Sequence, residues 1–112
     1  MDEGHAPASA GLEALAWQEL RQCYDPEIPV NIVDLGLIYA MQTEPRFEGG
    51  HRVQVLMTVT SPGCGMSEVL RDEVEARLRG LPGVEEVEVA VTFEPPWTPA
   101  RMTLEARAML NI

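Results

Sequence analysis

The fold is decided by residues 53–83, which read VQVLMTVTSPGCGMSEVLRDEVEARLRGLPG. At the start of this stretch, valines and a methionine occupy every second position, a pattern typical of a half-buried strand. From Met66 onward the apolar residues recur at three- and four-residue spacing, which predicts an amphipathic helix that ends at Leu81-Pro82-Gly83. The predicted apolar stripe of this helix consists of Met66, Val69, Leu70, Val74, Leu78 and Leu81.

Upstream, the apolar run Ile32–Met41 predicts another strand with a loop at its entrance. The turn Glu48-Gly49-Gly50 separates this run from the strand at residue 53, so the two strands are predicted to form a hairpin. Before them, apolar residues recur at helical spacing from Gly11 to Cys23. Asp25-Pro26 ends this first helix, because proline cannot continue it.

Downstream, valines at alternate positions of residues 87–91 predict a third strand. After the proline-rich connector 94–99, a last helix runs towards Leu110. Its N-terminal cap is either Thr98 or Thr103, and the sequence does not choose between them.

The predicted order is therefore helix, strand, strand, helix, strand, helix. Because a helix lies between the second and third strands, those two strands are expected to be parallel. We predict a compact single-domain α/β (α+β) sandwich with a small three-stranded mixed sheet and helices packed mainly on one face. Residues 1–10, which are small and polar, are expected to form a flexible tail, and residues 11–112 a single domain.

The charge balance excludes some classes of partner. The chain has 18 acidic and 8 basic residues and a formal net charge of −10. Nucleic acids and anionic lipids are bound by Lys and Arg, so neither partner is expected. No apolar run reaches the roughly 20 residues that span a membrane, and the acidic start resembles no secretory signal. The two cysteines do not suggest a disulfide framework, and we expect a reducing cytoplasm.

Cys64 is the candidate for chemistry. It lies between two glycines, after a strand and at the start of a predicted helix. Free backbone N–H groups and the helix dipole favour an anion there, so its thiol should ionise readily and act as a nucleophile or metal ligand. The alternative is a small buried hydrophobic residue, which is the common role of a free cysteine. Cys23 occupies an apolar helical position, and there we expect the core role.

The residues around Cys64 leave alternatives open. Asp25, Glu27 and Asp34 either shape turns and caps or line a pocket beside the cysteine. Thr60 and Ser61 either donate hydrogen bonds to the sulfur or to an anion bound near Cys64, or they belong to an ordinary strand and turn. Further along the chain, Trp97 is a lid or partner contact, or it fills the core, and filling the core is the simpler role.

Several enzyme hypotheses fail on spacing. Cys64 and Arg71 are separated by six residues, whereas the loop of a cysteine phosphatase needs five. The sequence contains no Cys-x-x-Cys pair and no Walker or dinucleotide glycine loop, and neither His5 nor His51 is placed to support a Cys–His pair. Zinc or an iron–sulfur cluster needs about four ligands. Any cluster at Cys64 would therefore take ligands from a second copy, a client protein or a small thiol.

Three separated motifs carry a family resemblance. Residues 25–39 read DPEIPVNIVDLGLIY, residues 57–66 read MTVTSPGCGM, and residues 93–97 read FEPPW. In this order they resemble the SufT/PaaD-like family of small metal–sulfur cluster assembly proteins, over residues 12–112. The family often has proline after the cysteine, where this chain has Gly65. PaaD-like members usually carry extra C-terminal cysteines, and this chain ends at Asn111-Ile112 without them, which favours the SufT-like branch.

The resemblance implies an α/β domain with a reactive cysteine that serves the maturation of iron–sulfur proteins. It places in one pocket the residues Asp25, Glu27, Ile28, Thr60, Ser61 and Cys64. The expected protein is a non-enzymatic accessory factor that carries or transfers a cluster, or links a carrier to its client, through Cys64. Its cargo would be a transient iron–sulfur cluster or iron.

The expected partners are iron–sulfur carriers or scaffolds and client apo-proteins. A homodimer would let each copy supply one ligand to a shared cluster. Two other hypotheses stay open: an adaptor in which the cysteine is incidental, and a thiol-dependent enzyme acting on a small molecule.

Overall fold

A computed structural model describes residues 8–60 and 66–112 of the chain. In chain order, the elements of this part are α1 (Ala8–Leu20), α2 (Ile32–Leu35), β1 (Ile38–Pro45), β2 (His51–Met57), α3 (Met66–Arg79), β3 (Val84–Val91), a 3-10 turn η2 (Pro99–Arg101) and α4 (Leu104–Leu110).

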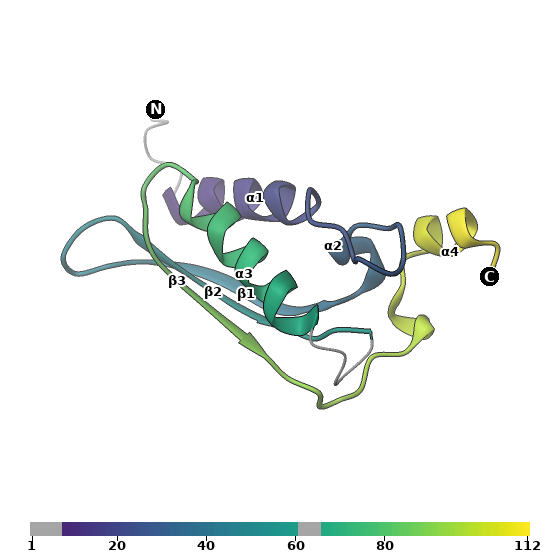
Figure 1. Ribbon diagram of the computed structural model, residues 1–112. Helices are drawn as coiled ribbons and strands as arrows, with labels where there is room; N and C mark the ends of the chain where they lie inside the picture. Colours follow the sequence, from purple (N-terminus) through teal and green to yellow (C-terminus); the bar gives the residue numbers. More distant parts are fainter. Residues whose placement is uncertain (1–7, 61–65) are drawn as a thin grey trace.

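The sheet has the strand order β1-β2-β3. β1 and β2 form an antiparallel hairpin, and β2 and β3 are parallel, joined by the crossover helix α3. Helices α1 and α3 lie side by side on one face of the sheet, and α4 lies at the end of the molecule opposite the β1–β2 turn (Figure 1). The predicted fold class, the hairpin and the parallel pair are confirmed.

The core lies between the sheet and these two helices, and it is built from aliphatic side chains because aromatic residues are few. α3 contributes Leu70, Val74 and Leu78, which are all buried at the predicted spacing. The prediction was wrong for Val69, which is 58% exposed. The solvent-facing side of α3 carries ion pairs between residues four apart, Glu73 with Arg77 at 3.2 Å and Glu75 with Arg79 at 2.7 Å.

The first helix has different bounds from those predicted. α1 begins at Ala8 rather than at Gly11 and ends at Leu20 rather than at Cys23. The last residues of the expected tail 1–10 therefore start a helix, while residues 1–7 lie outside the described part of the chain.

The prediction of a strand from Ile32 was also wrong. Ile32–Leu35 is a short helix, α2, and the strand begins only at Ile38. Asn31 caps this helix: its Oδ1 accepts a hydrogen bond from the backbone N–H of Asp34 at 2.9 Å. Gly36, at φ 82°, ends the helix in the left-handed conformation. Ile32 and Leu35, three residues apart, bury the apolar side of this single turn.

The two candidate caps of the last helix precede different elements, and only Thr103 makes a capping hydrogen bond. Thr103 caps α4, where its Oγ1 accepts a hydrogen bond from the N–H of Ala106 at 3.1 Å. Thr98 precedes η2 without a side-chain cap. The chain after β3 thus reaches α4 through the 3-10 turn η2, and residues 99–110 do not form one continuous helix.

The C-terminal segment packs against the short helix α2. The backbone N–H of Thr103 donates to the carbonyl oxygen of Asp34 at 2.9 Å. A Cβ at Gly36 would collide with the backbone of Arg101, so only glycine allows so close an approach.

We predict that Gly36→Ala lowers the free energy of unfolding by about 3 kcal/mol or more, because it adds a backbone clash to the cost of positive φ. Gly83→Ala is the matched control, since Gly83 has φ 83° and no atom near its Cβ position. It should cost about 1 kcal/mol. Urea unfolding monitored by circular dichroism measures both, and equal losses would contradict a close approach at Gly36.

Candidate functional site

Three segments far apart in the sequence meet at the end of the sheet near α2. The N–H of Thr58 donates to the carbonyl oxygen of Leu37 at 2.8 Å, and the N–H of Thr92 donates to that of Met57 at 2.8 Å. The hydroxyl of Tyr39 donates to the carbonyl oxygen of Pro95 at 2.7 Å. Residues 25–39, 57–60 and 92–97 therefore form one continuous frame.

Asp25 links the first of these segments to the second. Asp25 is buried, with an exposed fraction of only 7% for the residue. Its Oδ1 accepts hydrogen bonds from the N–H groups of Glu27 at 2.7 Å and Ile28 at 2.9 Å, which is the turn-forming role, one of the two that the sequence leaves open. Its Oδ2 accepts from the hydroxyl of Thr60 at 3.3 Å. Asp25 thus shapes the turn and also holds the segment that follows β2.

The other predicted pocket residues have different positions. Glu27 is exposed, and its backbone N–H takes part in the turn at Asp25. Ile28 is half-buried and packs against the core. Asp34 lies on α2, where its Oδ2 accepts a hydrogen bond from the side-chain amide of Asn31 at 2.9 Å. Ser61 and Cys64 lie outside the described residues, so their predicted place beside Asp25 and Thr60 stays a prediction.

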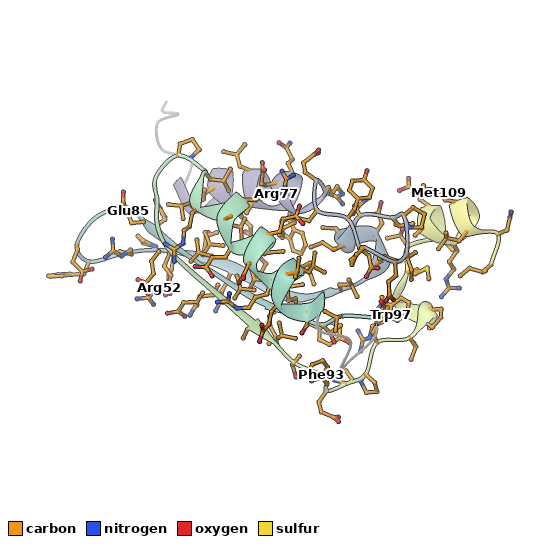
Figure 2. The ribbon with its side chains drawn as sticks, viewed as in Figure 1. Arg52, Arg77, Glu85, Phe93, Trp97 and Met109 are labelled. Carbon is orange, nitrogen blue, oxygen red and sulfur yellow. The ribbon has the colours of Figure 1, made fainter. Side chains whose placement is uncertain are left out.

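Trp97 is half-buried and packs against the core, as the simpler of its two predicted roles requires. Its indole N–H donates to the carbonyl oxygen of Leu35 at 2.7 Å, which fixes the ring against α2. The guanidinium of Arg101 lies over the ring of Tyr39, 4.5 Å from its centroid. Trp97 and Phe93 lie at the same end of the molecule, away from Arg52 and Glu85 (Figure 2).

A small pocket lies where these segments meet, with a volume of about 60 Å³. Its walls are Thr58, Val59, Thr60, Phe93, Pro96 and Trp97. Thr58, Val59, Phe93 and Pro96 were not predicted as site residues. A signal was present in the motifs at 57–66 and 93–97, which contain all four.

Cys23 has the predicted core role. Its side chain is fully buried. Burial away from water raises the pKa of its thiol from 9.0 to about 12, and the neighbouring carboxylate of Glu73 acts in the same direction. At neutral pH this thiol is protonated, so Cys23 is neither a good nucleophile nor a good metal ligand.

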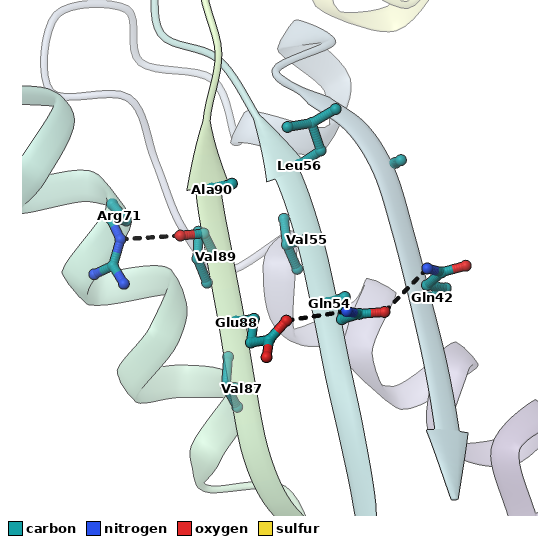
Figure 3. A pocket seen from close by; sticks show the side chains of 10 residues that line it. Gln42, Gln54, Val55, Leu56, Arg71, Val87, Glu88, Val89 and Ala90 are labelled. Atoms are coloured by element: carbon teal, nitrogen blue, oxygen red, sulfur yellow. Dashed lines mark hydrogen bonds between the residues drawn. The ribbon is translucent and has the colours of Figure 1, made fainter.

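A larger hollow, about 490 Å³, lies elsewhere, along β3 and the face of the sheet that the helices do not cover. Gln42, Gln54 and Glu88 form a hydrogen-bonded row across it, while the Arg71 Nε–H donates to the carbonyl oxygen of Val89 at the strand edge (Figure 3). The hydrogen bond from Gln54 lowers the pKa of Glu88. Because these polar groups satisfy one another, the hollow offers few that converge on a ligand.

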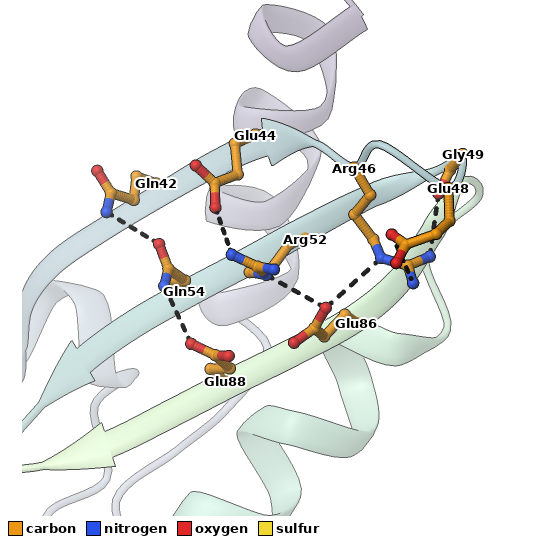
Figure 4. Close-up of polar contacts among 9 residues, drawn as sticks. All are labelled: Gln42, Glu44, Arg46, Glu48, Gly49, Arg52, Gln54, Glu86 and Glu88. Carbon is orange, nitrogen blue, oxygen red and sulfur yellow. Dashed lines mark hydrogen bonds and ion pairs between the residues drawn. The ribbon is translucent and has the colours of Figure 1, made fainter.

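Towards the β1–β2 turn, the same open face carries a row of charges. Arg52 pairs with Glu44 at 2.7 Å and with Glu86 at 3.2 Å, and Arg46 reaches Glu86 at 3.5 Å (Figure 4). Such exposed pairs contribute little stability, and they keep this end of the sheet in water.

Within residues 8–60 and 66–112, no cluster of three or more His, Cys, Asp or Glu side chains is placed to hold a metal ion. Among the same residues, no helix has both the length and the apolar character that crossing a membrane requires.

Comparison with known proteins points to one family. The model of the family described as iron–sulfur cluster assembly protein matches residues 13–91. The Fe-S protein maturation auxiliary factor YitW of Bacillus subtilis is 40% identical over 83% of this chain and 87% of its own length. The auxiliary factor SufT of Staphylococcus aureus is 36% identical over 79% of this chain and 96% of its own. The crystal structure of a domain of unknown function, DUF59, from Bacillus anthracis superposes with a TM-score of 0.80 at 33% identity, covering 96% of this chain and 99% of that one.

Asp25→Ala is expected to lower the free energy of unfolding by about 1–3 kcal/mol, because two backbone N–H groups and the Thr60 hydroxyl lose their acceptor. Asp25→Asn retains a carbonyl acceptor for the two amides and should recover most of that loss. Urea unfolding of both variants measures this. An equal loss of stability in both variants would show that the negative charge of Asp25, rather than its hydrogen bonds, stabilises the fold.

The Cys23 thiol should not react with Ellman's reagent at pH 8 in the folded Cys64→Ser variant, and it should react fully after unfolding. Because its folded pKa lies above 9.0, the unfolded chain ionises first, and stability should fall as pH rises from 9.0 towards about 12. Below pH 9 this group should have no effect. Cys23→Ala should lack this alkaline loss, and an equally steep loss in both proteins would contradict the burial of the thiol.

Proposed function

Because the chain belongs to the family of iron–sulfur cluster assembly proteins, we propose that it serves cluster assembly through Cys64. In this role it carries or transfers a cluster, or links a cluster carrier to a client protein. The proteins it resembles are named Fe-S protein maturation auxiliary factors. We propose that this chain is a non-catalytic factor and acts in the cytoplasm.

One observation supports Cys64 above all others: the hydrogen bond from Thr60 to the buried carboxylate of Asp25. It fixes the residue from which the cysteine-bearing segment starts, at the place where three motifs meet. The chain has two cysteines, and Cys23 is buried and protonated. Thiol chemistry at neutral pH is thereby left to Cys64.

The cluster is cargo in this proposal rather than a resident group. One ionised thiol is far from the roughly four ligands that a cluster takes. The remaining ligands would come from a second copy of the chain, a carrier or scaffold, or the client apo-protein. Such an incomplete ligand set suits transfer, because a client that offers more thiolates can take the cluster by exchanging ligands one at a time.

The residues around Cys64 would hold the cysteine-bearing segment in place. Asp25 and the backbone of Glu27 and Ile28 would fix the floor of the pocket. The Thr60 hydroxyl, which donates to Asp25, would anchor the start of the cysteine-bearing segment, and Ser61 would offer a hydroxyl near the sulfur. Asp34 would contribute indirectly, because it stabilises α2, and the indole of Trp97 is hydrogen-bonded to that helix.

We predict that Cys64→Ser abolishes function in cells that lack the native protein, and that the activity of their iron–sulfur enzymes falls to the level of the deletion strain. Cys23→Ala is the matched control, because it removes the other thiol and leaves no unpaired hydroxyl in the core. It should retain activity as long as the variant is expressed and folded. Enzyme activities in extracts, normalised to protein level, measure both.

Unchanged iron–sulfur enzyme activity with Cys64→Ser would favour the adaptor hypothesis and contradict this proposal. Turnover of a small thiol-reactive substrate by the purified protein, lost with the same substitution, would favour an enzyme instead.

A further inference from the structure

The outer strand β3 has one row of backbone groups that no other strand of residues 8–60 and 66–112 pairs with. The N–H of Thr92 donates to the carbonyl oxygen of Met57 at 2.8 Å, so the even-numbered positions along β3 bond to β2. Because backbone groups alternate in direction along a strand, the odd-numbered positions direct theirs outward, at Val87, Val89 and Val91. Such an edge can accept an extended segment of another protein as a further strand.

The hollow of about 490 Å³ runs along this edge, because residues 87–90 all belong to its lining. An added strand needs a backbone edge and room for its side chains, and the hollow offers both. Leu56 lies one strand further in and is 38% exposed. Its neighbours in register are Ala40 and Ala90, whose small side chains leave space around it on the open face. Figure 3 shows Leu56 and Ala90 side by side on this face.

Arg71 guards part of the edge. Its Nε–H donates to the carbonyl oxygen of Val89 at 3.1 Å, and its Nη1 pairs with Asp72 at 2.8 Å and with Glu75 at 3.0 Å. An added strand must displace this guanidinium from Val89. Because both carboxylates retain the guanidinium and the strand brings its own N–H to the carbonyl, the exchange loses no net hydrogen bond.

The charges along the edge select the occupant. β3 carries Glu85, Glu86 and Glu88 and no base, so pairing with a second copy would gather the glutamates of both chains at one seam. Glu86 is compensated by Arg52 at 3.2 Å. Glu88 accepts a hydrogen bond from Gln54, but among the described residues it forms no ion pair. A basic side chain opposite Glu88 would supply this missing cation.

The strand register fixes where each residue of an added strand would lie. Two neighbouring rows cross the open face, Gln42-Gln54-Glu88 and Ala40-Leu56-Ala90. An added strand extends each row by one side chain, so a base would lie beside Glu88 and an aliphatic residue beside Ala90. These two residues are two positions apart, and the residue between them faces α3. Arg71 and Glu75 favour a polar side chain there.

We propose that the outer edge of β3 binds an extended segment of a partner protein that reads aliphatic–polar–basic and runs antiparallel to β3. The basic residue pairs with Glu88, and the aliphatic residue lies beside Ala90 and contacts Leu56. Antiparallel pairing is the slightly more stable arrangement. Backbone bonds supply the affinity of such an added strand, and its alternate side chains supply the specificity. The inference goes beyond the proposed function, because this docking surface does not depend on the position of Cys64.

Titration of the isotope-labelled protein with short peptides tests the edge. The probe is the capped peptide Thr-Val-Thr-Lys-Thr-Thr-Thr, in which Lys lies opposite Glu88 when Val lies opposite Ala90. The first control has Glu in place of Lys, and the second is the reversed sequence, which has the same composition and charge. The third control carries N-methyl groups on the two threonines that flank Lys, so their backbone cannot donate. The backbone amide chemical shifts of Val87, Val89 and Val91 measure binding.

We expect the probe to bind about tenfold more tightly than each control, since each lacks the ion pair, the register or the backbone bonds. Glu88→Lys should invert the preference between the probe and the Glu peptide. Glu13→Lys is the matched control, because Glu13 is also exposed and the net charge changes equally. Glu13 lies on α1, which covers the other face of the sheet, so this variant should keep the preference (Figure 1).

Equal binding of the reversed or N-methylated peptide would overturn strand pairing, because net charge alone would then explain the affinity. A preference for Lys that survives Glu88→Lys would overturn the register. Glu88→Gln replaces that variant if circular dichroism shows it to be unfolded, and it should abolish the preference.

Two further results would contradict the proposal. Shifts of the three valine amides that depend on protein concentration alone would show that a second copy occupies the edge. If none of the peptides shifts these amides, the edge binds no added strand of this kind. Neither result bears on the cellular test of Cys64→Ser, so the proposed function is judged separately.

Discussion

The buried carboxylate of Asp25 is the constraint on which this end of the molecule depends. A carboxylate away from water is unstable unless hydrogen bonds replace its hydration. Two backbone amides close to Asp25 and the hydroxyl of Thr60, which is 35 residues away from Asp25 in the chain, supply them. This satisfied charge fixes the turn after α1 relative to the end of β2, and so it sets where the segment with Cys64 begins.

The sequence predicted those parts of the fold whose signal is local. Alternating valines gave the strands, the spacing of Leu70, Val74 and Leu78 gave the crossover helix, and the helix between two strands gave their parallel pairing. The prediction failed at Ile32–Leu35, because three apolar residues in a stretch of four are as compatible with a helical turn as with a strand. Only the cap at Asn31 and the packing of the C-terminal segment on Gly36 decide in favour of the helix.

The site was predictable in its parts but not in its connections. The motifs identified Asp25, Thr60 and Trp97, and turn chemistry identified what Oδ1 of Asp25 does. No periodicity relates Thr60 to Asp25 or Trp97 to Leu35, because contacts between distant segments follow from the tertiary fold. The small pocket is a product of those contacts. The two ends of the molecule differ accordingly: ion pairs cover the sheet near the β1–β2 turn, and aromatic and proline residues surround the pocket.

We propose that Cys64 binds the iron–sulfur cluster as a single ionised thiol, whereas the other cysteine, Cys23, stays buried in the core. Anaerobic reconstitution with iron and sulfide, followed by absorbance and native mass spectrometry, tests it most directly. The account predicts a labile cluster on the wild-type protein, bridging two copies or completed by a small thiol, and none on Cys64→Ser. A cluster bound equally well by Cys64→Ser would contradict it.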